Sequence, residues 1–222
     1  MKVSASLTEK ELNRKRQIRA PLEIGQTYIG ILTMNEITQS GLKRFYLYTQ
    51  DQETLIIASE FHNLNDISYH QISLSSTTFL PEDQHTLGLL VHQKSSSKKI
   101  GRLNHLADQT RREDCISIRM HREYEIPKHT LKSGESKIRI QMLPHSFTDV
   151  EDDYSIHQKS FSHFPKFYPD VKFIESKTNV LFVVKNRHCF SFAQLDEEEY
   201  FFAVSYPLSI FQGFCIAAAI LT

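Results

Sequence analysis

The last thirteen residues of the chain, 210–222, contain no charged side chain, and Gln212 and Thr222 are their only strongly polar residues. A helix over this segment would be about 20 Å long at ~1.5 Å per residue, which is shorter than the ~30 Å hydrocarbon core of a bilayer. No cluster of Lys or Arg flanks the segment, as a membrane anchor would favour. A helix that is apolar all round and remains in water must be enclosed on every side.

The chain before this segment has the pattern of β-strands. Between residues 28 and 206, short runs of β-branched and aromatic residues, many with period-two alternation, are separated by polar connectors. The runs are YIGILTM, RFYLYTQ, TLIIASEF, SYHQISL, TLGLLVHQ, CISIRMH, KIRIQML, VKFIE, NVLFVV, CFSFAQL and YFFAVSY. Together, these runs and the apolar segment predict an all-β barrel of about 11–12 mostly antiparallel strands, wrapped around a buried C-terminal helix over about 208–222.

The C-terminal helix is expected to fill the centre of this barrel. Its small residues keep it slim, and its large apolar residues reach the wall. The residues expected to form this core plug are Phe211, Phe214, Ile216, Ala217 and Ala218. Pro207 is expected in the first turn of the helix, where its missing N–H costs nothing.

Three other segments depart from the strand pattern. Residues 92–114 are rich in Ser and Lys, and residues 144–170 contain three prolines, so both are expected to be mostly loop, the second with room for one weak strand. Thr8 and Glu11 form a capping-box pattern, which predicts a helix to about Arg19. We expect residues 1–24 to form a basic, loosely attached arm, partly helical or disordered, and residues 25–222 to form the barrel domain.

Composition excludes several classes of function. The 26 basic and 26 acidic residues balance, which argues against a globally basic nucleic-acid binder. The three cysteines form no CxxC pair and each lies in an apolar pattern, so they are expected to be buried thiols in a reducing, cytoplasmic compartment. The N-terminus has no apolar core of signal-peptide length.

Motifs for catalysis or metal binding are not found. The sequence has no Gly-rich phosphate loop, GxSxG elbow or HExxH pair, and its eleven histidines do not combine with cysteine at zinc-ligand spacing. His188 and Cys189 are adjacent in a strand pattern and would point to opposite faces, which does not suit a base and its nucleophile. We therefore expect no enzyme activity, metal, cofactor or nucleic-acid partner.

The residues at the C-terminus resemble those of a known family. The block 192–220 is similar to the signature of the tubby C-terminal domain family: a Phe-rich strand, then Tyr206-Pro207-Leu208-Ser209, then Gln212, Phe214, Ile216 and Ala217. Residues 46–73 and 124–144 are similar to two further blocks of that family, in the same order. The resemblance implies a divergent tubby-like protein from about residue 25 onward, with a barrel threaded by an apolar helix.

The resemblance also implies a ligand. In the family, basic residues on the strands bind the headgroup of phosphatidylinositol 4,5-bisphosphate and tether the domain to the plasma membrane. In this sequence Glu60 and Asp66 stand at basic positions of the family, and Asn104 stands at another in the turn-like Gly101-Arg102-Leu103-Asn104. The phosphoinositide-binding residues that the resemblance and the local charge still favour are His62, Lys98, Lys99 and Arg102.

Basic residues are in local excess between residues 94 and 139. Against six acidic residues, this stretch contains twelve basic ones: Lys94, Lys98, Lys99, Arg102, Arg111, Arg112, Arg119, Arg122, Lys128, Lys132, Lys137 and Arg139. The excess favours a patch that faces an anionic membrane, where each charge is worth about 1 kcal/mol. A solvated face with ordinary surface charge is the alternative.

Two functions stay open. In the first, the chain is a monomeric, non-enzymatic tubby-like adaptor that binds phosphoinositide or other anionic lipid and carries a protein cargo. It would be cytoplasmic and peripheral at the plasma membrane, and the cilium and the nucleus stay open as further locations. In the second, favoured by Glu60 and Asp66, it is a degenerate tubby-like barrel that acts as a protein-interaction scaffold without phosphoinositide recognition.

Overall fold

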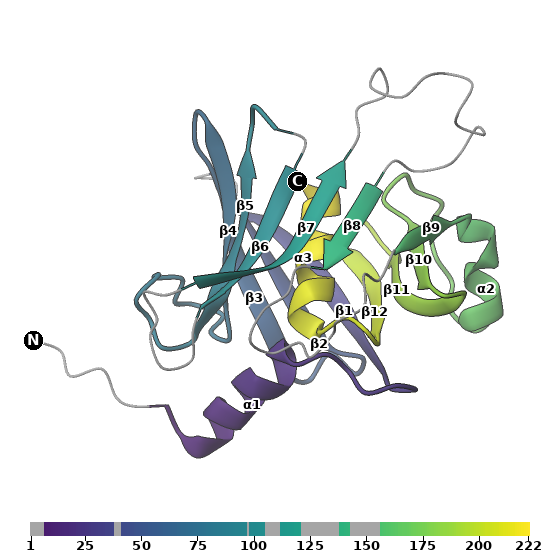
Figure 1. Cartoon of the computed structure of the whole chain (residues 1–222), viewed down its shortest axis with the longest axis horizontal. Helices are drawn as coiled ribbons and strands as arrows, with labels where there is room; N and C mark the ends of the chain where they lie inside the picture. Colours follow the sequence, from purple (N-terminus) through teal and green to yellow (C-terminus); the bar gives the residue numbers. More distant parts are fainter. Residues whose placement is uncertain (1–6, 38–40, 97, 105–111, 121–137, 143–155) are drawn as a thin grey trace, which may run out of the picture.

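The fold is one antiparallel sheet with a helix against its inner face (Figure 1). A computed structural model describes residues 7–37, 41–96, 98–104, 112–120, 138–142 and 156–222. The strands are β1 (Thr27–Ile37), β2 (Leu42–Thr49), β3 (Leu55–Asn63), β4 (Ile67–Ser73), β5 (Thr86–Gln93), β6 (Lys98–Asn104), β7 (Arg112–Met120), β8 (Ile138–Met142), β9 (His157–Lys159), β10 (Val180–Val184), β11 (Arg187–Gln194) and β12 (Glu199–Ser205). The helices are α1 (Glu9–Arg19), α2 (Phe164–Phe167) and α3 (Ile210–Leu221), and a 3₁₀ turn, η2 (Phe161–His163), precedes α2.

Neighbours in the sheet are mostly neighbours in sequence. The order is β8-β7-β6-β5-β4-β3-β2-β1-β12-β11-β10-β9, with every pair antiparallel. The pairing of β1 with β12 joins the two halves of the chain, and an isolated bridge between Ile140 in β8 and Ile156, next to β9, links the two ends of the order. The predicted antiparallel all-β fold with a C-terminal helix is confirmed.

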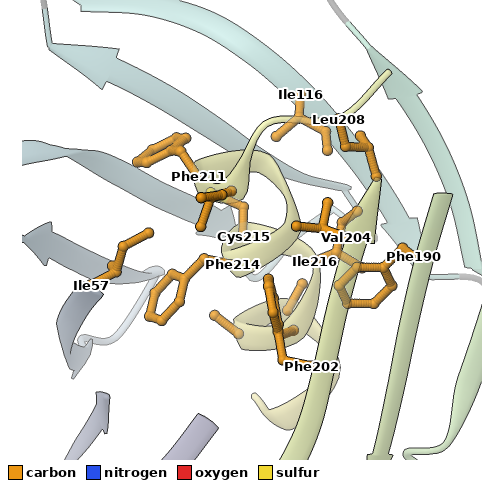
Figure 2. Close-up of a cluster of buried hydrophobic side chains, with 14 of the residues drawn as sticks. Ile57, Ile116, Phe190, Phe202, Val204, Leu208, Phe211, Phe214, Cys215 and Ile216 are labelled. Carbon is orange, nitrogen blue, oxygen red and sulfur yellow. The ribbon is translucent and has the colours of Figure 1, made fainter. Parts of the chain in front are cut away.

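Helix α3 lies in the middle of the fold, with strands on both sides of it (Figure 1). Residues 210–219 are all buried, and the five residues expected to form the core plug have no exposed surface. Phe211, Phe214 and Ile216 contact a shell of apolar side chains that comes from β3, β7, β11 and β12 (Figure 2). Figure 2 shows these apolar side chains gathered around α3, as a helix without a wet face requires.

The start of α3 satisfies its polar groups inside the core. Ser209, and not Pro207, begins the helix as its N-cap. The Ser209 hydroxyl accepts from the Gln212 N–H at 3.1 Å, and the Gln212 side-chain oxygen accepts from the Ser209 N–H at 2.9 Å. The Gln212 amide also donates to the Cys115 carbonyl at 3.0 Å. Buried polar groups need such partners, so Ser209 and Gln212 are structural residues.

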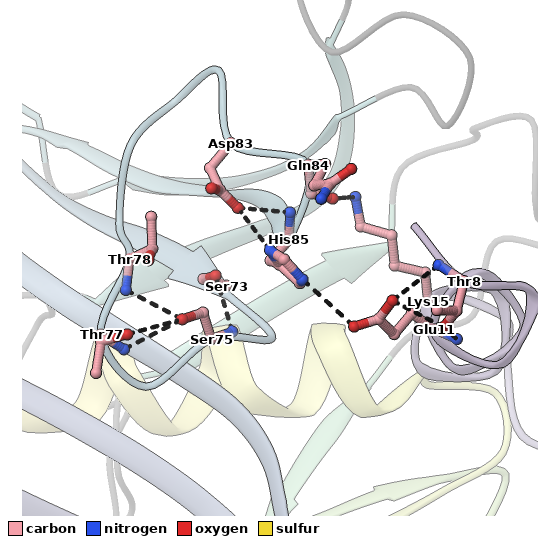
Figure 3. A network of polar contacts seen from close by, with 10 residues as sticks. All are labelled: Thr8, Glu11, Lys15, Ser73, Ser75, Thr77, Thr78, Asp83, Gln84 and His85. Atoms are coloured by element: carbon pink, nitrogen blue, oxygen red, sulfur yellow. Dashed lines mark hydrogen bonds and ion pairs between the residues drawn. The ribbon is translucent and has the colours of Figure 1, made fainter. Parts of the chain in front are cut away.

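Helix α1 is packed against the sheet, although residues 9–19 were expected in a loosely attached arm. The predicted capping box of Thr8 and Glu11 is present, and Ile18 is 2 % exposed. Figure 3 shows how Glu11 meets His85 at 3.5 Å while Lys15 donates to the Gln84 carbonyl, both in the segment before β5.

Arginine side chains complete this attachment. The guanidinium of Arg14 donates to the carbonyls of Leu55 and Ile56 in β3, and that of Arg19 donates to the carbonyl of Asn104 in β6. These hydrogen bonds from cationic side chains to main-chain oxygens hold α1 in place. The sequence did not predict the attachment, because such bonds do not produce an amphipathic pattern of apolar residues.

One predicted loop and one predicted strand differ from the structure. Strand β6 lies within residues 92–114, which were expected to be mostly loop. The strand was not predicted because its inward positions are Lys99, Gly101 and Leu103, of which only Leu103 is a typical core residue. The run VKFIE, 171–175, is not a strand: Phe173 packs with Phe164 over the outer face of the sheet. The short strand β9 lies in the second expected loop, which had room for one weak strand.

Candidate functional site

The register of β3 to β6 decides which predicted lipid-binding residues share a face. His62 pairs through Tyr69 and Val91 with Ile100, which stands between Lys98 and Arg102 at alternate positions of β6. Directly paired residues of antiparallel strands, and alternate residues of one strand, point to the same face. His62, Lys98 and Arg102 therefore lie on the outer face of the sheet, and Lys99 lies on the inner face.

Lys99 is tied to the C-terminal end of α3. Lys99 is 5 % exposed. Its ammonium group donates to the Ala219 carbonyl at 2.8 Å and to the Thr222 hydroxyl at 3.3 Å. Burial lowers the pKa of Lys99 to about 8. Next to it, His70 hydrogen-bonds with the Thr222 hydroxyl at 3.2 Å, and burial lowers the pKa of His70 to about 3. Lys99 is thus directed away from any lipid on the outer face, which corrects its assignment as a ligand residue.

His62 and Glu60 form part of a charge cluster on β2 and β3. The Glu60 carboxylate meets the Arg44 guanidinium at 2.8 Å and the His62 ring at 3.2 Å. The hydrogen bonds that Arg44 donates to Glu60 raise the pKa of Arg44, and the His62 ring stacks on Tyr69 with centroids 4.7 Å apart. Both basic side chains have an acidic partner on the same face, so this region offers little net positive charge to an anion.

Arg102 also has an acidic partner. Its guanidinium donates to Asp114 in β7 at 2.7 Å. The expected turn Gly101-Arg102-Leu103-Asn104 is instead part of β6, and Asn104, which stands where the family has an arginine, is completely buried. The Asn104 side-chain oxygen accepts from Arg112 at 3.2 Å, so its role is internal.

One basic pair on the outer face has no acidic partner in the described part of the chain. Lys98 in β6 is the register partner of Arg119 in β7, and the next position in the row, in β8, is Arg139. Arg119 is exposed and Lys98 is half-buried. We call Lys98 and Arg119 the basic pair. The four expected phosphoinositide-binding residues did not include Arg119, because only the strand register brings it beside Lys98.

Much of the predicted basic excess is not placed. Arg111, Arg122, Lys128, Lys132 and Lys137 lie outside the described residues, as does most of the block 124–144 that resembles the family. Lys94 is described: it is exposed in the turn before β6, and its ammonium group donates to the Leu64 carbonyl.

The histidines and cysteines do not form a reactive cluster in the described ranges. His188 lies in a cleft on the outer face, whereas its neighbour Cys189 is buried in the core, where burial raises the thiol pKa. No group of three or more His, Cys, Asp or Glu side chains that could hold a metal ion is found among residues with a described position.

None of the helices in the described ranges combines the length and the apolarity that crossing a bilayer requires. Comparison with known proteins gives no family: no protein-family model matches the chain, and no curated protein matches it.

Proposed function

We propose that the chain is a non-enzymatic, tubby-like adaptor that attaches to phosphoinositide-containing membrane and carries a protein partner. The observation that carries the membrane part is the basic pair: Lys98 and Arg119 stand side by side on the outer face, and neither has a carboxylate partner within the described residues.

The tubby-like part is supported by where the motif residues lie. Tyr206 to Ser209 lead into α3, and Ser209 and Gln212 hold the start of that helix inside the core. Such a motif suits a helix threaded through a barrel. In this proposal the twelve strands close around α3, and the bridge between Ile140 and Ile156 supports that closure.

The expected membrane contact is electrostatic and weak. A Lys or Arg close to an anionic leaflet is worth about 1 kcal/mol, and the attraction falls off within a Debye length of about 8 Å at physiological salt. The register of β6 and β7 places both cations side by side on the outer face, so both can reach one surface. A guanidinium also binds phosphate through two parallel N–H groups, which an ammonium does not do.

Vesicle sedimentation tests this proposal. The full chain is mixed with neutral phosphatidylcholine vesicles, or with the same vesicles containing phosphatidylinositol 4,5-bisphosphate. We expect binding only to the second kind, weaker at high salt and lost in the double variant Lys98→Ala/Arg119→Ala. The exposed residues Lys172 and Lys177, in the segment before β10, give a control that removes the same charge: Lys172→Ala/Lys177→Ala should bind like the wild type. Equal sedimentation with both kinds of vesicle would contradict the membrane part.

A second candidate is a protein-interaction scaffold without lipid recognition. It is favoured by the acidic partners of the basic residues on the outer face. Glu60 contacts Arg44 and His62, and Asp114 contacts Arg102. Here the wild type would not bind phosphoinositide vesicles, and the variant Glu60→Gln/Asp114→Asn would gain salt-sensitive binding because Arg44 and Arg102 lose their acidic partners. If the wild type ignores the vesicles and this variant does so too, the outer face has no role in lipid binding.

A further inference from the structure

A cleft of about 560 Å³ opens on the outer face of the sheet, far along the strand order from the basic pair. It lies between the loop that leads into β1, the adjoining ends of β1, β11 and β12, and the end of α2. Its lining residues are Ile24, Gly25, Gln26, Thr27, Ile29, Phe167, Tyr168, Arg187, His188, Ser205 and Tyr206. A volume of this size is typical of small-molecule sites, which span roughly 300–1,000 Å³.

One side of the cleft is a chain of neutral hydrogen-bonding groups. The Thr27 and Ser205 hydroxyls are 2.8 Å apart, and Ser205 hydrogen-bonds with Nδ1 of His188 at 3.1 Å. The other ring nitrogen of His188, Nε2, hydrogen-bonds with the Ser191 hydroxyl at 2.8 Å, and the Tyr168 hydroxyl lies 3.4 Å from the same nitrogen. Burial lowers the pKa of His188 to about 4, so this side carries no charge at neutral pH.

Arg187 supplies the charge of the cleft. It follows a two-residue hairpin turn in which Lys185 and Asn186 have φ of 47° and 63°, a geometry that fixes the start of β11. Of the described residues that line the cleft, Arg187 is the only Arg, Lys, Asp or Glu, and it has no carboxylate partner within the described ranges. The guanidinium is therefore available to an anion.

The remaining lining is apolar or aromatic. Ile24 and Phe167 are large apolar side chains that are 70 % and 42 % exposed. Ile29 and Tyr168 are partly buried and pack against the apolar cluster under α2. A ligand that covered Ile24 and Phe167 would remove this apolar surface from water, which favours binding.

We propose that this cleft binds a small monocarboxylate with an apolar or aromatic body. The carboxylate pairs with the two parallel N–H groups of Arg187, and the body lies against Ile29, Phe167 and Tyr168. One guanidinium matches one carboxylate in charge and in geometry, whereas a phosphate dianion would need a second cation that the described lining does not provide. The inference does not rest on the proposed membrane function, since the basic pair lies on β6 and β7.

Binding of a matched ligand pair tests the proposal. The probes are 4-phenylbutyrate and its neutral amide, 4-phenylbutyramide, titrated into the full chain and followed by calorimetry or by the NMR shifts of the lining residues. We expect the acid to bind more tightly than the amide by about tenfold or more, because a hydrogen bond to a charged group is stronger than one to a neutral group. Arg187→Gln should abolish this preference. Lys166→Gln is the control, since it removes an exposed charge next to Phe167 that does not line the cleft.

A second variant examines the apolar part. Phe167→Ala should weaken acid and amide by the same factor, because the ring contacts the body of the ligand and not its charge. Thermal unfolding of each variant checks that the fold is retained. Equal affinity of acid and amide in the wild type, retention of the preference in Arg187→Gln, or no binding of the acid at millimolar concentration would each overturn the proposal.

Discussion

The ammonium group of Lys99 donates a hydrogen bond to the main-chain oxygen of Ala219 at 2.8 Å and so joins β6 to the last turn of α3. The carbonyl groups of a last helical turn have no partner within the helix, and a cation there is favoured by the helix dipole. We predict that Lys99→Met lowers the free energy of unfolding by about 1–3 kcal/mol, because it leaves a buried carbonyl without a donor. Urea unfolding measures this change.

Lys98→Met is the matched control. It changes the neighbouring residue in the same way, but Lys98 is half-buried on the outer face, where a substitution typically changes stability by about 0.5 kcal/mol or less. The two variants should therefore separate, with Lys98→Met affecting vesicle binding and Lys99→Met affecting stability. Equal stability of the two would mean that Lys99 does not support α3.

The attachment of α1 gives a second prediction. Ile18 is 2 % exposed and belongs to the main apolar core, so Ile18→Ala should lower the free energy of unfolding by about 2–5 kcal/mol. Lys10→Ala, at an exposed position of the same helix, should leave it nearly unchanged. The midpoints of thermal or urea unfolding compare the two variants. If Ile18→Ala has no more effect than Lys10→Ala, α1 is the loose arm that the sequence suggested.

Stability should fall as the pH is lowered from about 7 to 5. Burial lowers the pKa of His70 and His188 from 6.5 to about 3 and about 4, so between pH 6.5 and 4 the unfolded chain binds protons that the folded chain does not. Each histidine then contributes a slope of up to about 1.4 kcal/mol per pH unit, and stability rises with pH. Lys15 and Lys99, whose pKa is lowered to about 8, are charged in both states in this range and do not contribute.

The slope of stability against pH separates the protonation of His70 from the hydrogen bonds that His70 makes. His70→Gln removes hydrogen bonds and is expected to be less stable at every pH, but it should also reduce the dependence on pH. His163→Gln, which removes a histidine that is not buried, is the matched control. Urea unfolding between pH 5 and 7.5 gives both quantities. An unchanged slope in His70→Gln would show that His70 is protonated in the folded state.

Regular apolar patterns made the sheet and α3 predictable from the sequence. Strands such as β10 and β12 read directly as runs of Val, Phe and Tyr, and α3 reads as a helix without a wet face. Strand β6 was missed because Lys99 faces the core and Asn104 is completely buried. Lys99 and the Asn104 main chain have partners more than eighty residues away, and the Asn104 side chain has a partner in the adjacent strand β7. Polar residues satisfied by distant partners carry no local signal.

The candidate sites depended on the same long-range information. Lys98 and Lys99 are adjacent and chemically identical, so composition cannot tell which of them faces solvent. The register assigns them to opposite faces, and it also brings Arg119 beside Lys98. The cleft with Arg187 and His188 was not predicted at all, because its residues come from four separated segments that no motif connects.

The position of Ala218 gives the sharpest test of the core. Ala218 lies on α3 with no exposed surface, and the helix around it is buried from Ile210 to Ala219. Ala218→Arg would bring a charge into this core without a partner, at a desolvation cost larger than the whole stability of a typical domain, about 5–15 kcal/mol. We expect this variant, like deletion from Ile210 onward, to lose the cooperative unfolding transition. Ser162→Arg, which adds the same residue at an exposed position, should unfold like the wild type. A soluble Ala218→Arg variant with a cooperative transition would mean that α3 does not fill the core in solution.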